Sequence, residues 1–335
     1  MNILTTKEEF CYGCDEGRPL TNDHIIPQAI GGKLKASLCV ECHTKIYSID
    51  TELTNNLQKI ATLLDVKRER KANRPFKVKQ VETGVAFEIN SRTGRRARPE
   101  VKIKFDQNGF PIPEVTASSK KDLKDILDGI KKKYGEISKT TEITTEPISL
   151  GLVEHENTVG GRLFMRSVAK TAYLFLASCL PKEKIFSETF KSIRDFVFEN
   201  QGESLTSFNF IHTKFMDDGR RQLHGIAVHF DNQKRNIVGY VQYFGVFRFS
   251  VLIARTFMGD IFIPDLKHCF NPITGNGIPL KSDFVIPDVT VDECLTPIQT
   301  TQFVFNEIER GLKRIELHCD SISQTTIEFL DHPNT

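Results

Sequence analysis

Four cysteines in the first fifty residues form two closely spaced pairs, and their spacing is typical of a metal site. Cys11 pairs with Cys14 and Cys39 with Cys42, with two residues between the members of each pair. Each pair offers two thiolates to one ion, and four thiolates complete the tetrahedral shell of Zn2+ at about 2.3 Å per bond. Such an ion organises a segment too small to fold around its own core. The spacing therefore predicts a structural zinc site.

Three further candidate ligands lie between and beside these pairs. Asp23 and His24 are adjacent and lead into Ile-Ile-Pro, and His43 directly follows the last cysteine. None of them is needed by a zinc ion that already has four cysteines, so a second, open metal site is the economical interpretation. One carboxylate and one imidazole leave most positions of a divalent ion free for phosphate and water. A neutral histidine can also accept a proton from water near neutral pH.

The complete series of Cys-x-x-Cys, Asp-His-Ile-Ile-Pro, Gly-Gly and Cys-x-x-Cys-His, within about residues 8 to 50, resembles the zinc-stapled form of the HNH endonuclease family. The resemblance implies a ββα-metal finger in which two strands carry the histidine motif and a helix begins near the last cysteine pair. It implies His24 as general base, and Asp23 and His43 as ligands of a catalytic Mg2+ or Mn2+. The Zn2+ ligands would be Cys11, Cys14, Cys39 and Cys42. The implied reaction is hydrolysis of phosphodiester bonds in nucleic acid, with DNA favoured.

Two interpretations of other classes remain open from the residues alone. A four-cysteine zinc module can bind nucleic acid or a protein partner without catalysis, and His24→Ala would then leave its role intact. A redox protein that uses the cysteine pairs would have reducible thiols and no stoichiometric zinc. Neither the choice between DNA and RNA nor any sequence specificity follows from the residues.

Local basic segments are the candidates for contacts with phosphates, because the net charge of the chain is only +2. Four arginines crowd around one expected turn, namely Arg92, Arg95, Arg96 and Arg98. Such a cluster can neutralise phosphates and give salt-dependent affinity. The competing interpretation of any charge run is a solvated face, which is the one we favour for Lys131-Lys132-Lys133.

The elements that must position these residues indicate an α+β fold class, with a small N-terminal ββα-metal zinc finger module followed by a larger α+β domain. Apolar residues at helical spacing predict helices over about 50–70, 119–134, 160–180 and 183–200. Strands are expected within 76–105, 208–215, 223–230, 238–254 and 314–330, with an extended piece at 140–148 and a turn or bulge at Gly245.

Three parts of the chain are expected. Residues 1–50 would form the nuclease module, 51–75 a linker helix with a basic segment, and 76–335 an α+β region with a sub-boundary near 135–155. A finger this small contacts little nucleic acid, so the last region is the candidate for targeting, sensing or assembly. Family analogy makes a homodimer, a small-molecule or protein activator, and a role in restriction or anti-phage defence compatible with this layout.

No stretch is long and apolar enough to span a bilayer, and the first ten residues lack the apolar core of a signal peptide. We therefore expect a cytoplasmic protein with no membrane partner. Thiols stay reduced in that compartment, which favours metal ligation by the paired cysteines over disulfides. The other cysteines, Cys179, Cys269, Cys294 and Cys319, have no paired spacing and are expected to be buried small apolar residues.

Overall fold

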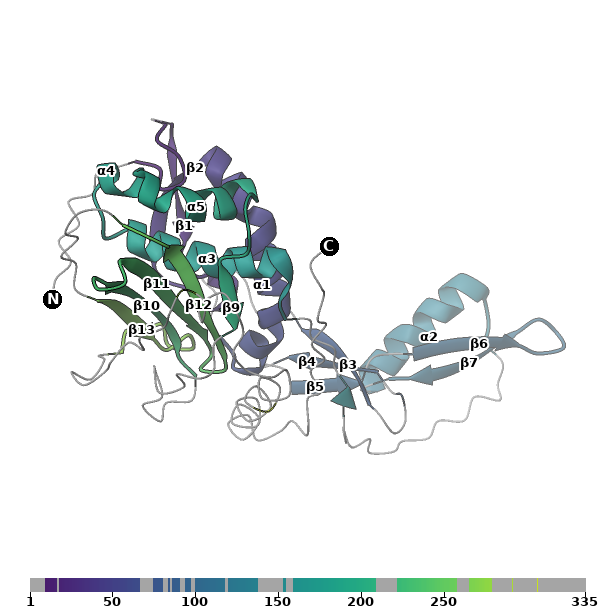
Figure 1. The fold of residues 1–335 in the computed structure, drawn as a ribbon. Coiled ribbons are helices and arrows are strands. Elements are labelled where there is room, and N and C mark those ends of the chain that lie inside the picture. The colour runs from purple at the N-terminus through teal and green to yellow at the C-terminus, as the bar shows by residue number, and fades with distance from the viewer. Residues whose placement is uncertain are drawn as a thin grey trace. The chain divides into compact units, whose positions relative to one another are not determined.

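The computed structural model describes residues 10–16, 18–66, 75–80, 84, 86–90, 94–97, 100–117, 120–137, 153–154, 159–208, 222–257, 265–278, 291 and 306. These residues fall into two compact units (Figure 1). The first unit contains the described parts of 1–73 and 157–320, and the second contains those of 74–156. Helices and strands occur in both units, so the expected α+β class is confirmed.

The first unit begins with a ββα arrangement. Strand β1 (Leu20–His24) pairs antiparallel with β2 (Lys35–Cys39), and the short helix η1 (Gln28–Ile30) lies in the loop between them. Gly31 ends η1 with a φ of 101°, a conformation that glycine adopts without steric cost. The helix α1 (Val40–Leu63) follows β2 directly. This order confirms the ββα module that the resemblance implied.

Helix α1 is one continuous element that begins ten residues before the expected start at residue 50. Its buried face repeats at helical spacing through Ile46, Ile49, Leu53, Leu57 and Ile60. The helix also ends earlier than expected, because its cap residue Leu64 is followed by a residue with positive φ at position 65. The basic stretch 67–74 lies outside the described residues.

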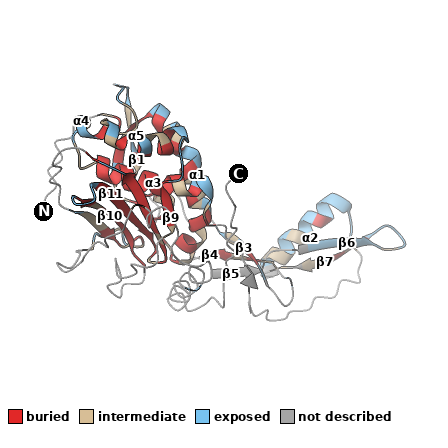
Figure 2. Ribbon diagram, viewed as in Figure 1, coloured by how far each residue is buried: buried red, intermediate tan, exposed pale blue. Residues whose placement is uncertain are grey.

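A second helix, α3 (Gly161–Ala177), packs against α1 and against four strands of a sheet. The sheet is antiparallel, with the order β13-β10-β11-β12-β9. Its strands are β9 (Thr206–Phe208), β10 (His224–Asp231), β11 (Asn236–Tyr243), β12 (Phe247–Ala254) and β13 (Leu266–Phe270). Helix α3 is buried from Arg166 to Ala177, and so are nearly all residues of β10, β11 and β12 (Figure 2). Helix α3 is thus the centre of the first unit, between the ββα module and the sheet.

The turn expected at Gly245 is confirmed, and it divides the segment 238–254 into the hairpin of β11 and β12. Phe244 and Gly245 adopt positive φ, and Val246 N donates to Tyr243 O at 3.0 Å. The strand β13 was not expected from the sequence. The expected strand at 208–215 is described only as far as Phe208, within β9. The expected pieces at 140–148 and 314–330 lie outside the described residues.

The single helix expected over 183–200 is wrong, because this segment is broken into short turns. They are α4 (Lys182–Ile185), η2 (Glu188–Phe190), α5 (Lys191–Arg194) and the π-turn η3 (Asp195–Glu199). Arginine side chains donate hydrogen bonds to main-chain carbonyl groups at these breaks. Arg194 donates to Ile185 O, and Arg166 of α3 donates to Phe196 O at 2.9 Å and to Val197 O at 2.7 Å. Helical spacing alone does not reveal such breaks.

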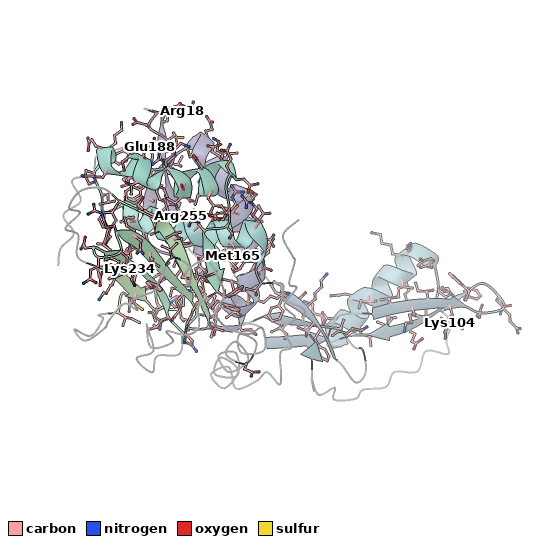
Figure 3. All side chains as sticks on the ribbon, in the orientation of Figure 1. Arg18, Lys104, Met165, Glu188, Lys234 and Arg255 are labelled. Atoms are coloured by element: carbon pink, nitrogen blue, oxygen red, sulfur yellow. The ribbon has the colours of Figure 1, made fainter. Side chains whose placement is uncertain are left out.

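The second unit is built from strands and one helix. β8 (Val153–Glu154), β3 (Phe76–Gln80), β4 (Ala86–Asn90) and β5 (Gly94–Ala97) form an antiparallel sheet, and β6 (Glu100–Phe105) pairs with β7 (Pro111–Thr116). The helix α2 (Lys120–Tyr134) contacts β7, and its three consecutive lysines at 131–133 are exposed. Lys104 of β6 also extends into solvent (Figure 3). Within the described part of the chain, no helix has the length and apolar character needed to cross a membrane.

Candidate metal centre of the ββα module

The four cysteines of the two pairs lie together in the first unit. Their sulfur atoms are all within 4.8 Å of one another, and Cys14 Sγ lies 3.6 Å from Cys39 Sγ. Tetrahedral bonds of about 2.3 Å place two sulfur ligands about 3.8 Å apart, so the cluster fits one Zn2+ ion. Cys11 and Cys14 come from the loop before β1, whereas Cys39 ends β2 and Cys42 lies in the first turn of α1. The ion would therefore join the loop to the helix.

Main-chain N–H groups stabilise negative charge on these sulfurs. Cys39 N and Gly13 N donate to Cys11 Sγ at 3.1 and 3.3 Å, and Cys42 N donates to Cys39 Sγ at 3.4 Å. A hydrogen bond from the Cys42 thiol, together with these N–H groups, outweighs burial and lowers the pKa of Cys11 to about 4. Burial raises the pKa of Cys14 to about 11, and the hydrogen bond with Cys11 together with burial raises the pKa of Cys42, so Cys11 ionises before Cys14 and Cys42.

Asp23 and His43 meet on the α1 side of the same module. Asp23 lies on β1 next to the strand end and His43 lies in the first turn of α1, and Asp23 Oδ1 is 3.4 Å from His43 Nδ1. Two donors at this separation can share one ion at about 2.1 Å from each. His43 Nδ1 is buried and forms no hydrogen bond with any residue that the structure describes, although 43% of the side chain is exposed. The pair fits a divalent ion with an open side.

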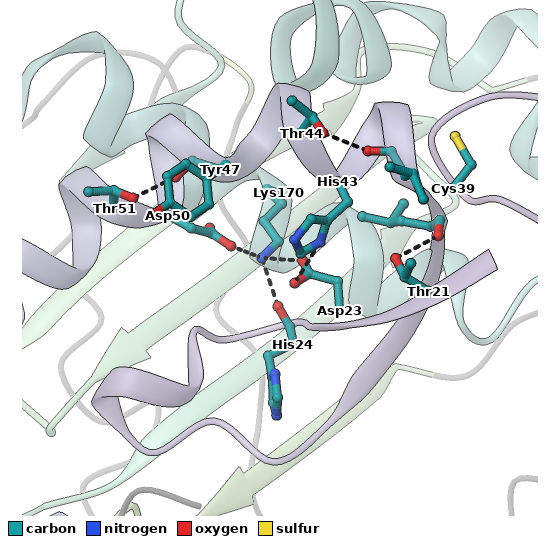
Figure 4. A network of polar contacts seen from close by, with 12 residues as sticks. Thr21, Asp23, His24, Cys39, His43, Thr44, Tyr47, Asp50, Thr51 and Lys170 are labelled. Atoms are coloured by element: carbon teal, nitrogen blue, oxygen red, sulfur yellow. Dashed lines mark hydrogen bonds and ion pairs between the residues drawn. The ribbon is translucent and has the colours of Figure 1, made fainter. Parts of the chain in front are cut away.

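The main-chain carbonyl of His24, and not its ring, faces Asp23 and His43 in this structure (Figure 4). Neighbouring residues of a strand point to opposite faces. Figure 4 accordingly shows the ring of His24 directed away from Asp23 and His43, whereas its carbonyl group faces them. The structure therefore brings Asp23 and His43 together and places the His24 ring apart from them.

A buried lysine completes the arrangement (Figure 4). The side chain of Lys170, on α3, has no exposed surface, and its Nζ lies 2.6 Å from Asp50 Oδ2, 2.7 Å from His24 O and 3.2 Å from Asp23 Oδ2. Asp50 belongs to α1, and Ser167 Oγ donates to its other oxygen at 2.8 Å. Burial alone would lower the pKa of Lys170, but the charges of Asp50 and Asp23 raise it above its usual value. The ammonium group is therefore a permanent charge of the site.

Sequence reasoning did not assign Lys170 and Asp50 to this site. Lys170 is 146 residues from His24, so no local motif contains both. One signal was present in the sequence: Lys170 is a cation inside an apolar helix, and lysines are almost never fully buried without partners. That signal reports that a partner exists but does not identify it.

Three further contacts dock the module on the rest of the first unit. The hydroxyl of Tyr173 donates to Tyr12 O at 2.8 Å. The hydroxyl of Thr171 donates to the carbonyl of Ile25, directly after β1, at 3.2 Å. His224 Nε2 lies 2.7 Å from Ile30 O. Through these contacts, side chains of α3 and β10 bind main-chain carbonyl groups before β1, after β1 and in η1.

The predicted arginine cluster belongs to the second unit. Arg95 and Arg96 lie on β5, where they pair in register with Ile89 and Glu88 of β4. Arg92 and Arg98 lie outside the described residues. A role of these arginines in phosphate binding stays a prediction.

Together, a two-stranded hairpin, a following helix, a four-cysteine cluster and an Asp-His pair define a ββα-metal module. Comparison with family models agrees: residues 11–58 match the model described as HNH endonuclease. The match spans β1, η1, β2 and most of α1, and it includes all four cysteines, Asp23, His24 and His43. Searches of curated proteins and of solved structures returned no match. The segment 11–58 is thus an HNH-family module within a longer chain.

Proposed function

We propose that this chain is a metal-dependent endonuclease that hydrolyses phosphodiester bonds in nucleic acid, with DNA as the favoured substrate. The observation that carries the proposal is the Asp23–His43 pair, whose donor atoms lie 3.4 Å apart inside the segment that matches the HNH family. Four cysteines already provide a complete zinc shell beside it. The Asp-His pair is therefore available for a second ion of catalytic type, Mg2+ or Mn2+.

The roles of the residues follow from their chemistry. Asp23 and His43 would hold the divalent ion, which supplies charge stabilisation at the phosphate and the departing oxygen when bound. His24 would take the proton of the attacking water as general base. Because the ring faces away from Asp23 in Figure 4, this role requires rotation of the His24 side chain toward the ion.

The direction of the His24 ring is also the observation that favours the second candidate function. A zinc module that binds nucleic acid or a protein partner without catalysis needs no base beside Asp23. In that case the hairpin and α1 would serve only as a scaffold, and Asp23 would serve to hold Lys170.

Residues beyond the module are assigned to targeting, sensing or assembly. Residues 1–50 would form the nuclease module, 51–75 a linker and 76–335 a larger region, in which Arg92, Arg95, Arg96 and Arg98 would contact phosphates. Part of the larger region has an additional structural role, because α3 and β10 bond directly to the histidine motif. A homodimer, an activating ligand or protein, and a role in restriction or anti-phage defence belong to the same proposal.

The test compares cleavage by the purified wild type, His24→Ala and His43→Ala. Supercoiled plasmid, linear DNA and RNA are incubated with Mg2+, Mn2+ or a chelator, and binding of each nucleic acid is followed by fluorescence anisotropy. His229→Ala serves as the matched control, because His229 of β10 pairs with Asp265 and takes no part in the contacts of the ββα module described above. We expect cation-dependent cleavage by the wild type and the control only. Unchanged binding without cleavage by any of the four proteins would support the scaffold function instead.

A further inference from the structure

Lys170 connects the two elements that carry the candidate ion ligands. Its ammonium group contacts β1 through Asp23 and the His24 carbonyl, and it contacts α1 through Asp50. The ammonium group donates hydrogen bonds to His24 O and Asp50 Oδ2, and it forms an ion pair with Asp23 Oδ2 at 3.2 Å. Since Lys170 is itself on α3, the distance between β1 and α1 at this point depends on a helix outside the HNH-matching segment.

The two oxygens of Asp23 have different neighbours. Oδ2 lies 3.2 Å from Lys170 Nζ, whereas Oδ1 lies 3.4 Å from His43 Nδ1. A carboxylate held at one oxygen cannot rotate freely about its last side-chain bond, so the other oxygen keeps its direction. The Lys170 contact thus presents Oδ1 toward the imidazole with which it would share an ion.

Asp50 holds the lysine in turn. Its Oδ1 accepts from Ser167 Oγ at 2.8 Å and its Oδ2 accepts from Lys170 Nζ at 2.6 Å, so both oxygens are engaged by side chains of α3. His43 and Asp50 are seven residues apart on α1 and therefore lie on one face of the helix. The same face of α1 thus provides a candidate ligand and the anchor of the lysine that orients the other ligand.

We propose that Lys170, anchored by Asp50, is a positioning residue that sets the affinity of the Asp23–His43 site for its divalent ion. This inference rests on the proposed function, because it needs an ion at that site. Its consequence is that the HNH-matching segment does not form a complete metal site without α3. Residues that orient metal ligands typically contribute about 10–100-fold to metal affinity.

A charge effect of opposite sign has to be separated from positioning. Removing the ammonium group alone adds one net negative charge beside the site, which by itself would tighten binding of a cation. The double variant Lys170→Met/Asp50→Asn removes one charge of each sign, so the net charge is unchanged while the anchor is lost. The amide introduced by Asp50→Asn still offers Ser167 an acceptor. The chain contains a matched control in Lys191→Met/Asp195→Asn, which makes the same changes in an exposed pair whose Nζ–Oδ2 distance is also 2.6 Å.

The experiment measures Mn2+ binding to the full-length zinc-loaded proteins by electron paramagnetic resonance of free Mn2+. Asp23→Asn and His43→Ala identify the binding that belongs to the site. We expect the Lys170/Asp50 double variant to bind Mn2+ about tenfold more weakly than the wild type. Its zinc content and circular dichroism should match the wild type, and the Lys191/Asp195 control should keep wild-type affinity.

Other outcomes separate the two proposals. If the wild type binds Mn2+ and Asp23→Asn abolishes binding, but the double variant keeps wild-type or tighter affinity, the positioning role is wrong and the proposed function stands. If Asp23→Asn and His43→Ala leave Mn2+ binding unchanged, the ion site itself is wrong, and both proposals fall together.

A more conservative variant tests the anchoring role of Asp50 if the double variant does not fold. Ser167→Ala removes the hydroxyl that fixes Asp50 and leaves every charge in place. We expect a smaller loss of Mn2+ affinity in the same direction. Unchanged affinity in folded Ser167→Ala would contradict an anchoring role of Asp50.

Discussion

His224 provides a sharp test of how the module is joined to the sheet. Its ring is fully buried on β10, with Nε2 2.7 Å from Ile30 O and Nδ1 3.2 Å from the main-chain nitrogen of Phe244. The carbonyl of Ile30 requires a proton on Nε2, and the N–H of Phe244 requires a lone pair on Nδ1. The structure therefore specifies the neutral ring with its proton on Nε2, and a second proton would break the bond from Phe244.

The size of the expected change in the free energy of unfolding follows from the pKa of the His224 ring. Burial lowers the pKa of His224 from 6.5 to about 4 in the folded protein. Between these values the unfolded chain binds more protons than the native state, so acid destabilises the fold. The stabilisation of the folded protein by the neutral His224 ring is fully present above about pH 6.5. It decreases by about 2 kcal/mol by about pH 5, and by about 3 kcal/mol once the pH is below about 4.

The assay is urea unfolding followed by circular dichroism, for the wild type and His224→Gln, at several pH values between about 5 and 7.5. Glutamine can donate to Ile30 O and accept from Phe244 N, but it does not titrate. Other groups that titrate, including His268 and the cysteines, are the same in both proteins, so their effects cancel in the difference. We expect the free energy of unfolding of the wild type, relative to the variant, to fall by about 2 kcal/mol on acidification. A difference that stays constant over this range would refute the assignment of a neutral buried His224.

Further predictions concern the zinc cluster and two glycines. Cys42→Ser should reduce the zinc content below one equivalent by mass spectrometry of metals, whereas Cys269→Ser, a buried cysteine outside the cluster, should leave it unchanged. Gly32→Ala should lower the free energy of unfolding by about 2 kcal/mol or more in thermal scans, because the added Cβ would overlap the carbonyl oxygen of Ile26. Gly129→Ala should stabilise the second unit by about 0.5–1 kcal/mol, since an added Cβ meets nothing within 4 Å on α2; equal effects of the two changes would contradict this reasoning.

Much of the module was predictable because its determinants are local in sequence. Two cysteines three residues apart place two thiolates within reach of one ion, whatever surrounds them. The apolar spacing of α1 and the alternation within 76–105 likewise depend only on the repeats of helix and strand. For these reasons the clustering of the four cysteines and the α+β class followed from the residues, whereas the ββα order followed from the family resemblance; the structure confirms all three.

The sequence alone did not predict which buried side chains contact one another. Apolar spacing marked α3 as a buried helix with Lys170 inside it, but only the packing of α3 between α1 and the sheet brings that ammonium group to Asp23 and Asp50. The breaks within 182–199 also depend on tertiary contacts, because the side chains of Arg166 and Arg194 donate hydrogen bonds to main-chain carbonyl groups at the turns.

The Asp23–His43 pair shows this difference between sequence and packing most clearly. The sequence alone determined that a carboxylate and an imidazole lie near four cysteines, because all of them are within 33 positions, from 11 to 43. Tertiary structure decided that Asp23 faces His43 while the ring of His24 faces away, since adjacent strand residues point to opposite faces and only the docking of β1 against α1 and α3 selects which face meets the helix. Spacing determines which groups can chelate an ion, and packing determines which of them point toward it.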